Sequence, residues 1–316
     1  MTGTFTFAHL SDLHLSAEHK RHNLRRADRL LSFIKALEVD HIVMTGDLAA
    51  DARSKDFEVA RRLFKSYGLL DPEKLSVIPG NHDIYGGVHT AEDILTFPRR
   101  VKETEYPEKV EEFREYFRET FSRALFASPT HPFPYAKEFG DVALIGVNSV
   151  ARHSRVNNPL GSNGEVDDGQ FRRLRLLLEA PPLQGKRKIV MIHHHFRKIA
   201  STQAGAVNSV WAAIERRTMK MRGKKRLFEI FREHNVDIVL HGHVHYNESY
   251  ERKGVRFLNG GGSLLGPQSP SMTLNLVRVS EDAVETRTIL VPEEIPALPA
   301  AVANPFLIPE SAQLAA

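Results

Sequence analysis

The chain has 316 residues, of which 41% are hydrophobic and 26% charged, and its formal net charge is +4 at pH 7. This composition is that of a folded globular protein and excludes a fibrous or largely disordered chain. The absence of cysteine excludes disulfides and thiolate-bound metals. The positive charge is mild for this length, so it agrees with an anionic substrate without indicating nucleic-acid binding.

Neither a targeting segment nor a membrane span is evident. The first residues run straight into a strand-like segment and lack the basic and apolar regions of a signal peptide. No apolar run approaches the length that a membrane span requires. We therefore expect a cytoplasmic protein.

Five short apolar segments have the character of buried strands, and each leads into polar residues. In chain order they cover 4–8, 41–44, 75–78, 188–192 and 236–240. Hydrophobic residues recur at helical spacing between them, around Leu31, Leu63, Leu174 and Ile230. This alternation of strand and helix predicts a layered α/β fold. Since such folds routinely exceed 200 residues, we expect one main domain.

Two regions lie outside this pattern. Segment 85–133 is rich in charged and aromatic residues, with Phe113, Phe117 and Phe121 at helical spacing. We interpret it as a helical insertion, either bordering the mouth of a site or peripheral to it. The residues from 292 to 316 are rich in proline and alanine and are predicted to form a C-terminal tail, which leaves 1–291 as the main domain.

Five polar motifs follow the predicted strands, one after each. They are Asp12-Leu13-His14, Gly46-Asp47, Gly80-Asn81-His82-Asp83, His193 and Gly242-His243-Val244-His245. Loops at the carboxyl ends of strands are where α/β sheets place their chemistry. We therefore expect these motifs to meet at one edge of the fold.

The motifs offer oxygen and nitrogen ligands but no thiolate. The candidate metal ligands are Asp12, His14, Asp47, Asn81, His193, His243 and His245. One zinc or magnesium ion does not need so many protein ligands, whereas two adjacent ions that share a carboxylate do. A mixed set of carboxylate, amide and imidazole suits Mn, Fe or Zn at a hydrolytic centre.

The motifs D-L-H, G-D, G-N-H-D, H and G-H-V-H resemble those of the calcineurin-like metallophosphoesterase family in order and spacing. The resemblance runs from about residue 5 to 265. It is closest to the bacterial subgroup that cleaves cyclic nucleotides and glycerophosphodiesters, which also carries a His-His-His run at the fourth motif. It implies a four-layer α/β/β/α sandwich of two mixed sheets. Strands of the second sheet are then predicted at 142–147, 255–258, 273–279 and 286–290.

The resemblance also implies roles for the motif residues at a centre of two divalent ions. Asp47 would bridge the ions, and a hydroxide held between them would attack the phosphodiester. The coordination shell of the first ion would be completed by Asp12, His14 and His245, and that of the second ion by Asn81, His193 and His243. His82 would donate a proton to the leaving oxygen or stabilise charge on the phosphoryl group. Asp83 would orient His82 or cap a helix.

The other histidines receive simpler interpretations. Within the triple histidine we expect His193 to be the ligand, with His194 and His195 as bystanders or substrate contacts. His241 is expected to be a hydrogen-bonded core residue. The remaining histidines, His19, His22, His89 and His153 among them, are interpreted as surface residues, although the first two could line the site.

The leading hypothesis is a phosphodiesterase acting on a small soluble ester such as a cyclic nucleotide or a glycerophosphodiester. The alternatives are a nuclease, a pyrophosphatase acting on a nucleotide-linked lipid, and a non-catalytic scaffold of the same fold. The basic cluster between Arg216 and Arg226 keeps the first two alternatives open. It contains no aromatic residue for base stacking, so nucleic acid is not the expected partner. A homodimer remains an alternative to a monomer.

Overall fold

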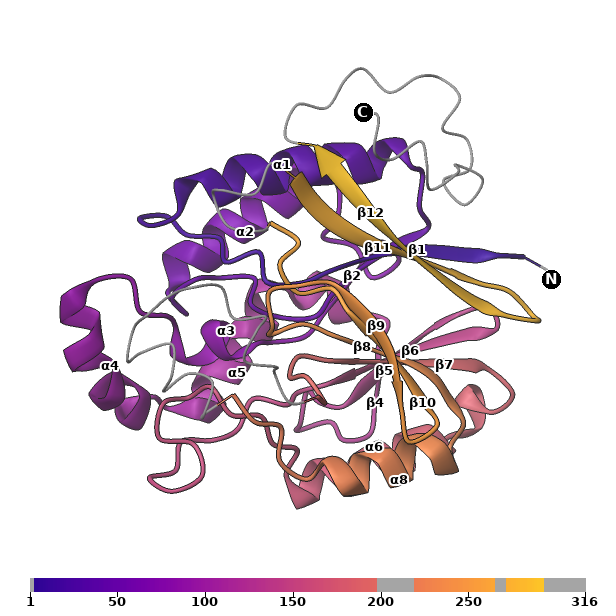
Figure 1. The fold of residues 1–316 in the computed structure, drawn as a ribbon. Helices are drawn as coiled ribbons and strands as arrows, with labels where there is room; N and C mark the ends of the chain where they lie inside the picture. The colour runs from indigo at the N-terminus through magenta and orange to yellow at the C-terminus, as the bar shows by residue number, and fades with distance from the viewer. Residues whose placement is uncertain (1–2, 198–218, 265–270, 293–316) are drawn as a thin grey trace.

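The computed structural model describes residues 3–197, 219–264 and 271–292. In these ranges the strands form two sheets, with orders β12-β11-β1-β2-β3 and β4-β5-β6-β7-β8-β10-β9. The predicted tail lies almost entirely outside the described residues. Figure 1 shows the two sheets face to face, with helices on the outer side of each.

The first sheet combines three parallel strands with an antiparallel hairpin. The parallel strands are β1 (Phe5–Leu10), β2 (His41–Met44) and β3 (Leu75–Val77). The hairpin of β11 (Ser271–Val279) and β12 (Val284–Pro292) joins them through antiparallel pairing of β11 with β1. The outer face of this sheet is covered by α1 (Arg21–Ala36) and α2 (Ser54–Ser66).

The second sheet has a parallel centre and antiparallel edges. Its parallel strands are β6 (Val142–Val147), β7 (Arg187–Ile192), β8 (Val236–His241) and β10 (Val255–Asn259). The edges are formed by β4 (Leu125–Phe126), β5 (Tyr135–Phe139) and β9 (Glu248–Arg252). The helices α6 (Asp168–Glu179) and α8 (Lys224–Glu233) lie along its outer face.

Alternating side chains of the second sheet fill two separate cores. In β7, Ile189 and Met191 belong to the core between the sheets, whereas Val190 and Ile192 belong to the core beneath α6 and α8. This period of two is expected of a strand buried on both faces. The predicted four-layer α/β/β/α sandwich is therefore confirmed.

The predicted division of strands between the sheets was partly wrong. Segments 273–279 and 286–290 were expected in the second sheet but form β11 and β12 of the first. The other two, 142–147 and 255–258, do belong to the second sheet. A strand's local pattern reports how it is buried, whereas its partner depends on contacts far along the chain, here the pairing of Phe5 with Val279.

Four short elements connect the sheets on the side where β1, β2 and β3 end. They are α3 (Asn81–Tyr85), α4 (Ala91–Glu103), α5 (Tyr106–Tyr116) and the 3₁₀ turn η1 (Arg118–Phe121). A second 3₁₀ turn, η2 (Pro181–Leu183), follows α6. Phe113, Phe117 and Phe121 are buried, and the ring centroids of Phe113 and Phe117 lie 6.1 and 6.3 Å from that of Phe57 in α2. These contacts hold α5 against α2.

A buried histidine at the far end of β2 gives a prediction for acid stability. His41 is 1% exposed, and its ring contacts the Glu73 carbonyl and the Ser76 hydroxyl at 2.8 Å each. Burial, assisted by Lys137, lowers the pKa of His41 from 6.5 to about 3. As the pH falls below 6.5, the unfolded chain therefore takes up a proton that the folded chain excludes, and stability falls.

We expect His41→Gln to reduce this loss of stability at acidic pH. Between pH 7 and pH 5 the free energy of unfolding should fall by about 2 kcal/mol less in the variant than in the unchanged protein. Urea unfolding at several pH values measures the difference. Parallel stability curves would show that His41 does not carry this proton linkage.

Candidate metal centre

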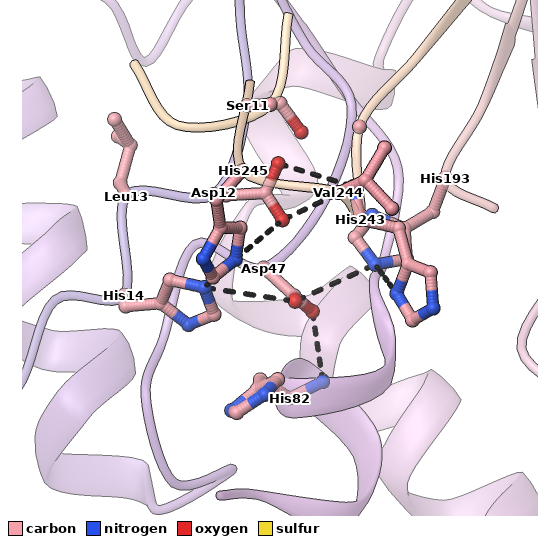
Figure 2. A network of polar contacts seen from close by, with 12 residues as sticks. Ser11, Asp12, Leu13, His14, Asp47, His82, His193, His243, Val244 and His245 are labelled. Carbon is pink, nitrogen blue, oxygen red and sulfur yellow. Dashed lines mark hydrogen bonds and ion pairs between the residues drawn. The ribbon is translucent and has the colours of Figure 1, made fainter. Parts of the chain in front are cut away.

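The five motifs meet at one edge of the fold, where strands of both sheets end. The first sheet supplies the loops after β1, β2 and β3, and the second supplies those after β7 and β8. The first two loops are tied together by backbone hydrogen bonds, from Asp12 N–H to the Gly46 carbonyl at 3.1 Å and from His14 N–H to the Asp47 carbonyl at 2.9 Å. Figure 2 shows their side chains converging between the sheets.

Four of the candidate ligands have backbone conformations that side chains rarely adopt. Their φ angles are positive: Asp12 58°, His14 44°, Asp47 53° and His243 72°. Such conformations cost of order 1–3 kcal/mol each and persist only where the surroundings impose them. Gly46 has φ 93°, and a Cβ there would lie 2.6 Å from Gly80 N and 2.7 Å from His193 Nδ1. The glycine of the Gly-Asp motif is thus required by close packing.

One cluster of ligand atoms surrounds His193. Its Nδ1 lies 2.8 Å from the Thr45 carbonyl, so in the neutral form of the ring Nδ1 carries the proton and Nε2 has a lone pair. That Nε2 lies 3.1 Å from Asn81 Oδ1, 3.2 Å from His243 Nδ1 and 3.4 Å from Asp47 Oδ2. Ligands about 2.0–2.2 Å from one cation are about 3.0–3.4 Å apart, so these donor atoms fit a metal ion.

A second cluster lies on the other side of Asp47. His14 Nε2 is 3.1 Å from His245 Nε2, and His245 Nε2 is 3.6 Å from Asp12 Oδ1. Asp47 Oδ2 lies 3.9 Å from His14 Nε2 as well as 3.4 Å from His193 Nε2. The same carboxylate oxygen therefore faces both clusters. The His14 Nδ1 and His243 Nε2 atoms are buried without a hydrogen-bond partner.

The electrostatics of the centre are dominated by burial and by Asp47. Burial opposes ionisation of Asp47, but His193, His82 and His14 hold the pKa of its carboxyl well below the usual range. Burial lowers the pKa of His14 and of His243 far below 6.5, so both rings are neutral. Burial also acts to lower the pKa of His193, yet Asp47 raises it to about 9. Metal binding at this cluster would therefore release a proton.

His82 lies beside the second cluster, and two contacts that involve backbone atoms hold it in place. Its N–H donates to Asp47 Oδ1 at 2.8 Å, and its Nδ1 lies 3.0 Å from the Ala50 carbonyl. Its ring stands edge-on to that of His14, with centroids 4.5 Å apart. Nδ1 is therefore the protonated nitrogen of the neutral ring, and Nε2 remains for other contacts. Burial lowers the pKa of His82.

Asp83 contacts the backbone of the neighbouring loops. Its buried carboxylate accepts hydrogen bonds from the N–H groups of Leu48 at 3.3 Å, Ala49 at 2.8 Å and Gly80 at 2.8 Å. These bonds cap the start of α3 and join the second motif to the third. Asp83 therefore positions the backbone around Asp47, and the capping alternative is the one that the geometry favours.

The neighbouring histidines fall into two groups. His194, His195 and His241 are buried, and two of them have polar partners: Ser149 Oγ lies 2.8 Å from His194 Nδ1, and the Tyr250 hydroxyl lies 2.9 Å from His241 Nε2. The interpretation of His89 as a surface residue was wrong. Its side chain is 8% exposed and bonds Asp51 Oδ1 at 2.9 Å.

A cavity of about 160 Å³, here called the side cavity, opens beside the centre. One wall is formed by the side chains of His14, Asn81, His82 and His245. The rest of the lining, here called the far wall, is formed by Lys20, Gly86, Gly87, Val88, His89, Phe97, Leu160 and Ser162. Five of these residues belong to segment 85–133, so part of this segment borders the centre. The individual residues of the far wall were not predicted, and the one local signal was Gly86-Gly87, which follows α3 and brings the chain back beneath His82.

Replacing Asn81 tests the cluster around His193. We expect Asn81→Ala to weaken metal binding about 10- to 100-fold, because one oxygen ligand is lost while the histidines remain. Calorimetric titration of the metal-free protein with Mn²⁺ measures the affinity. Asn235→Ala, in the turn after α8, is the matched control, and unchanged binding in Asn81→Ala would remove Asn81 from the ligand set.

Comparison with solved structures places this fold among known ones. A dimetal phosphatase from Danio rerio aligns over 92% of this chain and 99% of its own, with a TM-score of 0.58 and 11% identity. GAP50, the anchor in the inner membrane complex of Plasmodium, aligns over 91% of this chain and 84% of its own, with a TM-score of 0.50 and 13% identity. At these identities the likeness shows the fold alone.

The curated proteins and the family models give different results. No curated protein matches the chain. The model of the calcineurin-like phosphoesterases matches residues 5–247, which include all five motifs. Three overlapping groups among the described residues could each hold a metal ion and agree with a divalent metal centre: Asp12, His14 and His245; His14, Asp47 and His82; and Asp47, His193 and His243. The chain belongs to the calcineurin-like phosphoesterase family, whose members are hydrolases of phosphoesters.

Proposed function

We propose that this protein is a phosphodiesterase with two divalent metal ions, Mn, Fe or Zn, and that it acts on a small ester of the cyclic-nucleotide or glycerophosphodiester type. The observation that carries the proposal is the position of Asp47 Oδ2, 3.4 Å from His193 Nε2 and 3.9 Å from His14 Nε2. When bound, the metal ions would neutralise the phosphate and lower the pKa of a water molecule.

The residues of the chain divide the remaining tasks. Asp12, His14 and His245 hold one side of the centre, whereas Asn81, His193 and His243 hold the other, with Asp47 between them. His82 lies next to the centre with Nδ1 fixed by the Ala50 carbonyl. We assign to His82 the transfer of a proton to the leaving oxygen. The anionic substrate would favour the doubly protonated ring, which would give up its Nε2 proton while Nδ1–H stays on the Ala50 carbonyl.

The amide of Asn81 is a further feature of the centre. It would bind a hard cation without adding negative charge. The centre would therefore stay electrophilic toward an anionic phosphoester.

Hydrolysis of model esters tests the proposal. We expect Mn²⁺-dependent cleavage of bis(4-nitrophenyl) phosphate with a higher kcat/KM than for 4-nitrophenyl phosphate, and loss of this activity in Asp47→Asn. Preference for the monoester would make the protein a phosphatase. No cleavage of either ester by metal-loaded protein would contradict the proposal.

The basic cluster gives little support to a nuclease or a lipid pyrophosphatase. Arg216 and Arg217 lie outside the described residues. In the described part of the cluster, Arg226 pairs with Asp168, Arg222 lies 3.9 Å from Glu165, and Lys225 lies 3.9 Å from Glu229. These pairs neutralise much of the charge that a polyanion would need. None of the described helices is long and apolar enough to cross a membrane.

The scaffold alternative makes a separate prediction about metal content. A non-catalytic protein of this fold has no need to keep ligands in strained conformations, yet Asp12, Asp47 and His243 have positive φ here. We expect about two equivalents of metal in protein purified with Mn²⁺, measured by mass spectrometry of the digested sample. Substoichiometric metal that does not rise on addition of Mn²⁺, Fe²⁺ or Zn²⁺ would favour the scaffold.

A further inference from the structure

The side cavity lies directly beside the candidate metal centre. His82, the residue that we assign to protonation of the leaving oxygen, is part of its wall together with His14 and His245. The cavity volume of about 160 Å³ is below the roughly 300–1,000 Å³ of pockets for drug-sized ligands. It therefore suits one small substituent of the phosphate and not a whole nucleotide.

The far wall of the side cavity has an apolar part and a polar part. Val88, Phe97 and Leu160 provide the apolar part, and Phe97 is 6% exposed. Lys20 and His89 provide the polar part. A substituent that fits this wall has a short apolar body with a polar end, and the lysine favours a negative charge at that end.

His89 is fixed in place by contacts on several sides. Its Nε2 lies 2.9 Å from Asp51 Oδ1, and its backbone N–H donates to Asp93 Oδ2 at 3.0 Å. Its ring stacks on that of His19, with centroids 4.8 Å apart and planes 23° apart. Asp51 is 5% exposed, and its Oδ2 lies 4.0 Å from His19 Nε2 and has no hydrogen-bond partner among the described residues. These contacts hold the His89 ring in one orientation in the lining of the side cavity.

The path of the chain between His82 and His89 depends on two glycines. Gly86 has φ 77°, and a Cβ there would lie 2.7 Å from the Asp51 carbonyl. A Cβ on Gly87 would lie 2.8 Å from the His82 ring. The chain can thus pass directly beneath His82, which fixes the distance between the proton donor and the polar end of the side cavity.

We propose that the side cavity is the leaving-group subsite and that it selects esters whose alcohol carries an anionic group, a carboxylate or a phosphate, beyond a short apolar body. Lys20 and His89 contact the anion, and Val88, Phe97 and Leu160 contact the body. The proposal rests on the proposed phosphodiesterase function, since it assigns His82 to the leaving oxygen. Lys20 and His89 are specificity residues and take no part in bond cleavage.

A pair of matched esters tests the subsite. Methyl 4-carboxyphenyl phosphate and methyl 4-carbamoylphenyl phosphate differ in one charge at the far end of the leaving group. We expect the Mn²⁺-loaded protein to favour the carboxylate by about 10-fold or more in kcat/KM, the value of one charge-assisted hydrogen bond. The ratio should fall toward one in Lys20→Met and in His89→Gln, and remain in Lys74→Met, an exposed lysine before β3.

The outcomes separate this proposal from the one on which it rests. Two results overturn the subsite even if bis(4-nitrophenyl) phosphate is cleaved. One is a kcat/KM ratio of carboxylate to carboxamide ester near one in the unchanged protein. The other is a ratio that stays high in both Lys20→Met and His89→Gln. A matching ester with a 4-phosphonate end shows which anion is preferred. If no ester is cleaved, calorimetric titration with the two leaving groups, 4-hydroxybenzoate and 4-hydroxybenzamide, tests whether the subsite binds the anion. Tighter binding of the carboxylate that is lost in Lys20→Met supports the subsite, and equal affinities, or a preference kept in Lys20→Met, overturn it.

Discussion

Asp47→Asn is expected to remove at least one of the two bound metal ions and to slow phosphodiester turnover by about 10³-fold or more, because the several kcal/mol that a metal contributes to the transition state are lost. Asparagine keeps the shape of the side chain and tolerates the left-handed backbone at φ 53°. The substitution therefore removes a charge between the two clusters without forcing the loop to move.

Metal content and kcat measured on the same sample check this prediction. Asp282→Asn, an exposed carboxylate between β11 and β12, is the control for loss of one negative charge. Thermal unfolding monitored by circular dichroism shows whether the variant is folded. If Asp47→Asn keeps two equivalents of metal, then Asp47 does not bridge them, and the assignment of a shared carboxylate is wrong.

His82→Ala should lower kcat by about 10²–10⁴-fold with both metal ions retained. The reason is that the backbone N–H of His82 donates to Asp47 Oδ1 at 2.8 Å. Truncation of the ring therefore leaves this hydrogen bond to Asp47 intact. His131→Ala, at an exposed position before β5, is the matched control. Loss of metal from His82→Ala would instead make His82 a ligand.

The leaving group decides between the two roles that His82 could have. A proton donor matters most when the alcohol is a poor leaving group. Its loss should therefore lower kcat far more for an alkyl ester than for a 4-nitrophenyl ester. A residue that stabilises charge on the phosphoryl group should affect both esters equally. We expect the first pattern, and equal losses for the two esters would contradict proton donation.

The fold could be predicted from local patterns wherever burial alone decides the structure. Strands such as β7 and β8 are continuous apolar runs, and helices such as α6 show hydrophobic residues at intervals of three and four. The position of the β11–β12 hairpin could not be predicted in this way. The hairpin lies beside β1 because of pairing between residues more than 250 positions apart, and both sheets offer strands of similar character.

The candidate ligands could be read from the sequence because short motifs hold them, but the surroundings of the centre could not. Asp83 was expected to contact His82, its neighbour in sequence, whereas its partners are backbone N–H groups of the preceding loop. His89 was taken as a surface residue because nothing around it in the sequence indicates Asp51, which lies 38 residues earlier. Contacts of this kind depend on how loops fold together, which short-range patterns do not encode.

The distribution of ligands along the chain also sets an order of events in synthesis. Asp12 and His243 are 231 residues apart and meet at the same centre. At about 5–20 residues per second, a ribosome adds His243 on the order of ten seconds or more after Asp12. The pairing of β1 with β11, which starts at Ser271, comes later still. The complete set of candidate ligands is therefore available only late in synthesis, and a nascent chain that has exposed only its first three motifs lacks the histidines of the last two.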